Sequence, residues 1–280
     1  MEAFTIKKAL NNNVLIVTHP IYDEVVLIGK GIGFNRKKGD HISKESVEKM
    51  FVLTNEKEQE QYKKLLPYID EDMLGVIISA IELIRKRTAS ILNEHIHVAL
   101  TDHILFSINR LMSGLSIKNP FLAETKVMYP AEYAIAEEVI DFINDAVNIT
   151  LPEGEIGFIA LHIHSAVTNK DLSEVNQYSQ LVAKLIQIIE EQFQMKLNKE
   201  DIHYMRLVRH LRYAIERVIK GEKINEPDKI TLFLKQEYPL SYNLAWKIIK
   251  IMQQTLKKPV YDAEAVYLTM HLQRIQNKLK

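Results

Sequence analysis

The sequence predicts a multidomain, mainly α-helical protein in which a small antiparallel β-sheet domain precedes two homologous all-α helical bundles. Three observations predict this fold class. Short β-branched runs separated by turn residues extend to about residue 55, apolar residues recur at spacings of three and four beyond it, and the helical part repeats itself. The 280 residues, 47% of them hydrophobic, suffice for several cores. We expect domains at 1–57, 60–170 and 172–280.

The N-terminal segment has the pattern of strands joined by turns. Clusters of Asn, Gly and His-Pro separate the apolar runs, as is typical of turns. The core of so small a domain is marginal, so pairing with a second copy is expected. The predicted strands are Phe4–Leu10, Val14–Thr18 and Val25–Ile28, with Met50–Leu53 as a possible fourth.

Beyond residue 55 the apolar period becomes helical. Glycine is sparse there, proline falls at the ends of apolar segments, and good helix formers are common. The apolar stripes that show the period are Ile77, Ile81 and Ile84; Ala136, Ile140, Ile143 and Val147; and Leu181, Leu185 and Ile188.

The helical region contains an internal repeat. Tyr129-Pro130 recurs 109 residues later as Tyr238-Pro239, and the same offset aligns Glu155 with Glu264 and His162 with His271. An offset of 107 aligns His103 with His210 and Arg110 with Arg217. Chance similarity of amphipathic helices explains apolar matches, but it does not readily explain two histidine pairs in register. We therefore expect a duplicated domain.

Composition excludes several classes of protein. The 36 basic and 36 acidic side chains give a formal net charge of zero, so a uniformly basic nucleic-acid binder is excluded, whereas a locally basic one is not. The absence of cysteine excludes disulfides, thiolate metal sites and thiol catalysis. No signal peptide or membrane-spanning run is evident, so we expect a cytoplasmic protein with no stable membrane insertion.

The stretch GKGIGFNRKK at residues 29–38 is locally basic and rich in glycine. Glycines let a backbone approach phosphates closely, basic side chains neutralise phosphates, an aromatic ring can stack on a base, and asparagines offer bidentate contacts to base edges. A solvated hairpin with Phe34 in the core explains the composition about equally well. The candidate contact residues are Asn11, Asn13, Gly29, Lys30, Gly31, Phe34 and Arg36.

The four repeated histidines admit three interpretations. Each can be a core histidine held by a neighbour. A metal site would use His95 with His97, or His162 with His164, but this spacing does not converge on a helix. The third interpretation is a phosphorylatable nucleophile, because imidazole keeps a lone pair near neutral pH. Glu155 and Glu264 precede His162 and His271 by seven residues, so a carboxylate on the same helix face could orient each ring.

Six motifs together resemble the BglG/SacY/LicT family of transcriptional antiterminators, most closely its glucose-specific GlcT-type branch, over essentially the whole chain. They are KKALNNNVLIV (7–17), LIGKGIGFNRKKGD (27–40), LNEHIHVALTDHI (92–104), LPEGEIGFIALHIHSA (151–166), LVRHLR (207–212) and AVYLTMHL (265–272).

The resemblance implies a dimeric co-antiterminator RNA-binding domain followed by two phosphotransferase-system regulation domains (PRDs). This homodimer would bind a leader-RNA stem-loop and stabilise it against an overlapping terminator, with a glucose permease gene as the expected target. It implies RNA contacts at Asn13, Gly29, Lys30 and Phe34, and phosphorylation at His103, His162, His210 and His271. The sugar permease (enzyme II) would act on the first histidine pair and the phosphocarrier HPr on the second. No enzyme activity, cofactor or metal is expected.

Two alternatives remain open at this point. A DNA-binding activator with the same regulation domains would open with a helix-turn-helix, whereas residues 1–55 have a strand pattern. A hydrolytic metalloenzyme built on the histidines would require bound metal.

Overall fold

The computed structural model describes residues 3–29, 31–51, 60–61, 64–65, 69, 71–88, 90–223 and 228–277. It divides into two compact units, which are described separately. The first contains Met1–Ile117, Ile135–Glu155 and Ser165–Asn169, and the second contains Lys118–Ala134, Ile156–His164 and Lys170–Lys280.

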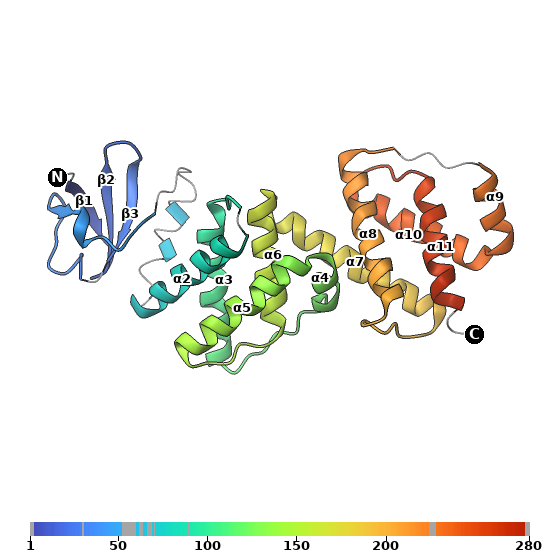
Figure 1. Cartoon of the computed structure of the whole chain (residues 1–280), viewed down its shortest axis with the longest axis horizontal. Helices are drawn as coiled ribbons and strands as arrows, with labels where there is room; N and C mark the ends of the chain where they lie inside the picture. The colour runs from blue at the N-terminus through green and yellow to red at the C-terminus, as the bar shows by residue number, and fades with distance from the viewer. Residues whose placement is uncertain are drawn as a thin grey trace. The chain divides into compact units, whose positions relative to one another are not determined.

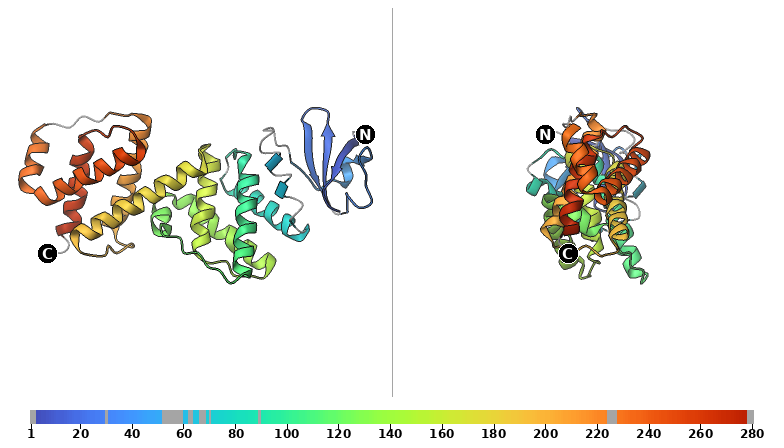
Figure 2. Two further views of the ribbon diagram at one scale, coloured as in Figure 1. Left: turned by 180° about the vertical axis from the view of Figure 1, so that it is seen from behind. Right: turned by 90° about the vertical axis from the view of Figure 1, so that its right-hand side faces the viewer.

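Five antiparallel strands form the N-terminal sheet in the order β4-β1-β2-β3-β5, and β1, β2 and β3 lie side by side at its centre (Figures 1 and 2). The strands are β1 (Ala3–Ala9), β2 (Val14–His19), β3 (Asp23–Ile28), β4 (His41–Ser43) and β5 (Lys49–Phe51), with a 3-10 turn, η1, at Lys44–Ser46.

The three central strands confirm the sequence prediction, and β5 overlaps the possible fourth strand, of which Val52 and Leu53 lie outside the described residues. Strand β4 was not predicted from the sequence. This edge strand has only three residues, and its single buried side chain, Ile42, leaves no alternation to recognise.

One face of the sheet holds the core of the domain. Alternate residues of the central strands point to it, as the two-residue period of a strand requires. A loop residue and the edge strand complete this cluster, whose members are Phe4, Ile6, Leu15, Val17, Val25, Leu27, Ile32 and Ile42. Val14 and Val26, which point to the other face, are buried as well, in a second apolar cluster.

Ten helices follow in the described part of the chain (Figure 1). They are α2 (Glu71–Thr88), α3 (His95–Met112), α4 (Leu122–Met128), α5 (Pro130–Val147), α6 (Gly154–Thr168), α7 (Leu172–Phe193), α8 (Ile202–Lys220), α9 (Asp228–Glu237), α10 (Pro239–Leu256) and α11 (Ala263–Asn277). The apolar stripes predicted from the sequence fall in α2, α5 and α7. None of these helices is long and apolar enough to span a membrane.

Local signals explain the helix bounds. Both α5 and α10 begin at the repeated proline, which is preset for the first helical turn. Asp201 caps α8 by accepting a hydrogen bond from the backbone N–H of His203 at 2.8 Å. Gly221 ends the same helix in the left-handed conformation that a C-cap requires.

The second unit surrounds one large apolar core. Helices α7, α8, α10 and α11 supply most of it, and α4 packs on α7 and α8. Helix α9 contacts α10 and α11. The paired histidines of the second repeat therefore lie on two helices, α8 and α11, that pack directly together.

Gly33 in the sheet domain and Gly75 in α2 differ in the space around them. A Cβ atom at Gly33 would meet the carbonyl oxygen of Asn11 at 2.2 Å, whereas one at Gly75 in α2 would meet nothing within 4 Å. We expect Gly33→Ala to lower the free energy of unfolding by about 1–3 kcal/mol through overpacking. Gly75→Ala should raise it by about 0.5–1 kcal/mol, because alanine favours a helix. Urea unfolding of both variants checks this, and equal effects would contradict the close approach.

Candidate nucleic-acid interface and histidine sites

The turn between β1 and β2 is hydrogen-bonded to the loop after β3. Asn11 Oδ1 accepts from the backbone N–H of Asn13 at 2.9 Å. Asn13 Oδ1 accepts from the backbone N–H of Gly31. Gly33 N–H donates to the carbonyl of Asn12 at 2.7 Å. The asparagines and glycines singled out in the sequence therefore meet at one end of the sheet.

The same loop exposes an aromatic ring and a cation. Phe34 is 62% exposed although it follows the buried Ile32, which anchors the loop in the core. Arg36 is exposed as well, and its backbone N–H donates to the carbonyl of Gly33. The solvated-hairpin interpretation required Phe34 to lie in the core, and the exposed ring contradicts it. Lys30, the other predicted basic contact, lies outside the described residues.

Gly29 has a structural reason to be glycine. A Cβ atom there would lie 2.5 Å from the carbonyl oxygen of Ser46. Gly31 differs, because its φ of +70° belongs to the left-handed region, and a Cβ atom would meet nothing within 4 Å. Both glycines therefore shape the loop, whatever the loop binds.

A buried carboxylate organises the first helical repeat. Glu155 of α6 is 1% exposed and accepts hydrogen bonds from Ser107 Oγ at 2.8 Å and from Arg110 Nη2. His103 Nε2 lies 3.0 Å from Glu155 Oε2. All three partners belong to α3, so this carboxylate joins α3 to α6.

The surroundings of Glu155 favour its charged form. Burial raises the pKa of this carboxyl, but hydrogen bonds from His103 and Ser107 and the charges of His103 and Arg110 outweigh burial and leave the pKa below its usual value. A negative charge is therefore held against the ring of His103.

The second repeat contains the same carboxylate with a different histidine contact. Glu264 of α11 forms a bidentate pair with Arg217, with Nε–Oε1 at 2.7 Å and Nη2–Oε2 at 2.8 Å. His210 Nε2 lies 3.7 Å from Glu264 Oε2, beyond hydrogen-bond distance, and this buried nitrogen has no hydrogen-bond partner among the described residues. The serine of the first repeat is replaced by Ala214.

His210 is held neutral. Burial, followed by the charges of His271 and Arg217, lowers its pKa to about 3. Its ring centroid lies 4.7 Å from that of His271, whose pKa is also lowered, first by burial. A neutral imidazole keeps the lone pair that phosphorylation requires.

Each of the two carboxylates contacts a histidine on another helix. The sequence spacing placed Glu155 and Glu264 on the faces of His162 and His271, and the structure places them against His103 of α3 and His210 of α8. His162 itself is buried in α6. The arginines that hold the carboxylates were not predicted as site residues, although their register in the repeat was visible.

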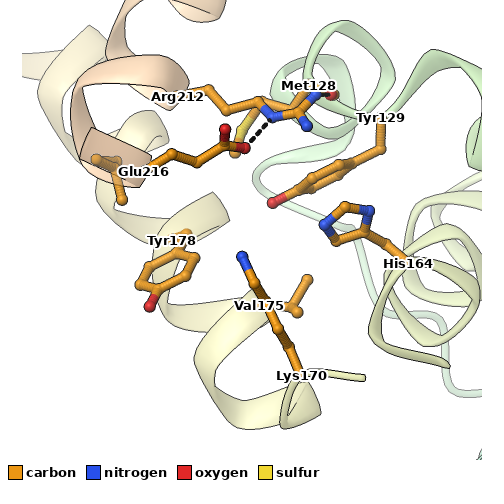
Figure 3. Close-up of a pocket in the computed structure, with 9 residues that line it drawn as sticks. Met128, Tyr129, His164, Lys170, Val175, Tyr178, Arg212 and Glu216 are labelled. Carbon is orange, nitrogen blue, oxygen red and sulfur yellow. Dashed lines mark hydrogen bonds and ion pairs between the residues drawn. The ribbon is translucent and has the colours of Figure 1, made fainter. Parts of the chain in front are cut away.

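A third polar cluster lies around a small pocket in the second unit (Figure 3). Arg212 pairs with Glu216 at 2.9 Å, and its guanidinium lies 5.0 Å from the centre of the Tyr129 ring. His164 stacks on the other face of the Tyr129 ring, with the two ring centroids 4.0 Å apart. Its Nδ1 is hydrogen-bonded to Glu132 Oε1 at 2.8 Å. Burial raises the pKa of Tyr129 to about 12. This cluster joins residues of both repeats and was not predicted from the sequence.

Among the described residues, no group of three His, Asp or Glu side chains is arranged to hold a metal ion. The described part of residues 1–55 forms a sheet, which disfavours the helix-turn-helix expected of a DNA-binding activator.

A small sheet domain with an exposed Gly-rich basic loop, followed by a duplicated helical domain with paired histidines, is the arrangement expected of a nucleic-acid-binding regulator. The CAT RNA binding domain model matches residues 4–60. The PRD domain model matches twice, at residues 78–166 and 183–275, which confirms the predicted duplication.

Similarity to known proteins covers the whole chain. The PtsGHI operon antiterminator of Bacillus subtilis is 61% identical over 277 residues, 99% of each chain. The GlcA/glcB genes antiterminator of Staphylococcus carnosus is 44% identical, over 97% of this chain and 96% of that one. The crystal structure of GlcT CAT-PRDI matches with a TM-score of 0.54 and 60% identity, over 60% of this chain and all of that chain.

The chain belongs to the BglG/SacY/LicT family of antiterminators, and its matches include GlcT-type proteins. Members of this family are RNA-binding regulators and not enzymes.

The depressed pKa values of the second histidine pair predict a pH dependence. A histidine whose pKa is lower in the folded state than in the unfolded state makes its full contribution to the free energy of unfolding above about pH 6.5. This contribution is lost as the pH falls. We expect the free energy of unfolding to fall below pH 6.5 by up to about 1.4 kcal/mol per pH unit for each such histidine. His210→Asn should reduce this slope between pH 6.5 and 5, above the range in which Glu155 takes up a proton.

Urea midpoints at several pH values measure this slope. His41→Asn, at an exposed position of β4, is the matched control and should keep the parent slope. If the slope of the His210 variant equals that of the parent, His210 is not buried in its neutral form.

Proposed function

We propose that the protein binds a stem-loop in leader RNA and stabilises it against an overlapping terminator, under the control of histidine phosphorylation in its PRDs. The observation that carries this proposal is the CAT RNA-binding match at residues 4–60 in a chain 61% identical to an antiterminator. The proposed target is the leader of a glucose permease gene, because relatives of the chain are named for the PtsGHI operon and for GlcT. Nascent transcripts place this activity in the cytoplasm.

The proposed RNA contacts are the loop residues identified above. Exposed Phe34 offers a stacking surface and Arg36 a charge for phosphate, while Asn11, Asn13, Gly29 and Gly31 shape the surface. We include Lys30 on its sequence position alone. The protein acts as a homodimer in this proposal, because a sheet domain this small gains core and RNA-binding surface by pairing. The proposed domains are 1–57, 60–170 and 172–280.

The proposed phosphorylation sites are His103 and His162 in the first PRD and His210 and His271 in the second. A phosphoryl group carries a charge of roughly −1.5 to −2. On His103 it would face the buried charge of Glu155, 3.0 Å from the ring nitrogen, and would disturb the contact between α3 and α6. The proposed donors are the sugar permease for the first pair and HPr for the second.

Exposed Phe34 allows a direct test of RNA binding, because its removal disturbs little of the core. We expect the full-length protein to bind leader RNA of the Bacillus subtilis ptsGHI operon. The logarithm of the binding constant should fall linearly with the logarithm of the salt concentration. Phe34→Ala should weaken binding about tenfold or more, since a base stack contributes about 1–3 kcal/mol. Fluorescence anisotropy at several salt concentrations measures both effects.

Tyr22→Ala is the matched control, since Tyr22 is an exposed aromatic residue in the β2–β3 turn at the opposite end of the sheet. It should bind like the parent. Equal binding of duplex DNA of the same sequence, or equal loss in the two variants, would contradict an RNA surface at the loop.

A charge placed at His103 should mimic part of the effect of phosphate. We expect His103→Asp and His162→Asp to weaken RNA binding through the dimer, while the two alanine variants stay active. His95→Asp is the control, because it adds the same charge to the first turn of α3, where a carboxylate is favourable. Anisotropy and sedimentation measure affinity and dimer content, and identical values for the Asp and Ala variants would falsify the proposed switch.

A further inference from the structure

Basic side chains line the helix faces around the second histidine pair. His203, Arg206 and His210 follow one another on α8 at intervals of three and four, so they share one face. On α11, Arg274 follows His271 by three residues and lies on the same face as that histidine. Both arginines are exposed, so their guanidinium groups are accessible.

These two faces meet at the histidines. Helices α8 and α11 pack together, and the rings of His210 and His271 lie 4.7 Å apart. Burial lowers the pKa of His271, and the charges of Arg274, Arg206 and His203 on these two faces lower it further. His271 therefore lies in a positive field that comes from both helices.

The first PRD lacks these cations. With the repeat offsets of 107 and 109, the positions of His203, Arg206 and Arg274 correspond to Ile96, Ala99 and Ser165. The residue before the first histidine differs in sign as well, because Asp102 corresponds to Arg209. The two PRDs therefore share the positions of the paired histidines, but only the second has basic residues at these surrounding positions.

We propose that Arg206 and Arg274 form a phosphoryl clamp that binds a phosphoryl group on His271 and prolongs its lifetime relative to the first PRD. This inference rests on the proposed function, in which these histidines are phosphorylated. Guanidinium groups suit this role because their planar donors bind phosphate oxygens in pairs. The two arginines are positioning residues, since they hold the transferred group and do not form the N–P bond.

The clamp also predicts that a phosphoryl group meets different charges in the two PRDs. Near His271 the added negative charge meets two arginines and is neutralised. Near His162, which corresponds to His271, the positions of the clamp arginines hold the uncharged Ala99 and Ser165. The second PRD therefore holds a phosphoryl group on this histidine with two cations, and the first PRD has no cation at the corresponding positions.

Phosphoramidate tests the clamp without a protein donor. A ring nitrogen of histidine attacks phosphorus, the P–N bond to ammonia breaks, ammonia leaves, and the ring loses its proton to water. The full-length protein is treated with phosphoramidate and desalted, and phosphate on each histidine is followed over time by peptide mass spectrometry. In Arg206→Gln/Arg274→Gln we expect the half-life on His271 to fall about fivefold, a modest factor because exposed arginines are screened by solvent. The half-life on His103 should not change.

Three matched variants separate the clamp from general charge or folding effects. Lys247→Gln/Lys250→Gln removes two exposed charges from α10 of the same PRD and should behave like the parent. The corresponding double lysine variant of the clamp keeps the charge but loses paired bonding, so its half-life should be intermediate. Ala99→Arg adds a cation to the first PRD and should lengthen the half-life of phosphate on His162.

The outcomes distinguish the clamp from the function on which it rests. If His271 of the parent takes up no phosphoryl group, phosphorylation at this site fails and the clamp fails with it. If the parent is phosphorylated and the double glutamine variant loses phosphate no faster than the α10 variant, the clamp alone is overturned. Selective loss from His271, with partial rescue by lysine, supports it.

Discussion

Each helical repeat depends on one buried carboxylate and the arginine that neutralises it. Glu155 and Glu264 are 1% and 2% exposed, and a buried charge is tolerated only when it is paired and hydrogen-bonded. Arg110 and Arg217 supply that pairing from the facing helix. Because removal of one partner of such a pair costs about 3–5 kcal/mol, these contacts hold α3 to α6 and α8 to α11. A histidine beside each pair places a titratable, modifiable group at the contact on which each repeat depends.

The two repeats use this framework differently. In the first, Ser107 and His103 both reach the carboxylate, so the histidine lies in direct contact with it. In the second, Arg217 occupies both oxygens of Glu264, and His210 is left neutral without a hydrogen bond to it. Replacement of Ser107 by Ala214 removes one polar contact, and the bidentate arginine compensates. The histidine of the first PRD is therefore in direct contact with the buried carboxylate, whereas that of the second PRD is buried beside an ion pair that does not include it.

Much of this architecture could be predicted from the sequence, for physical reasons that differ between elements. The central strands and the long helices have regular apolar periods, so β1 to β3 and the stripes in α2, α5 and α7 were visible. Strand β4 was not visible, because three residues at a sheet edge with one buried side chain carry no period. The repeat revealed the histidines and, in the same register, the carboxylates and arginines. Which groups meet across helices could not be predicted: spacing along α6 relates Glu155 to His162, but the contact with His103 depends on how α3 packs against α6. The stack of Tyr129 between His164 and Arg212 is similarly a property of tertiary packing.

The glycine-rich loop after β3 shows why exposure, and not position in a motif, separates a candidate contact residue from a residue that supports the loop. Asn13 accepts a hydrogen bond from the backbone of Gly31, and Gly33 lies against the carbonyl of Asn11, so both residues build the loop. Loss of RNA binding on changing either one would follow from a misplaced loop as readily as from a lost RNA contact. Phe34 differs, because its ring is 62% exposed while its neighbour Ile32 anchors the chain. The exposed ring is therefore the feature of this loop that protein packing does not account for and that stacking on RNA would.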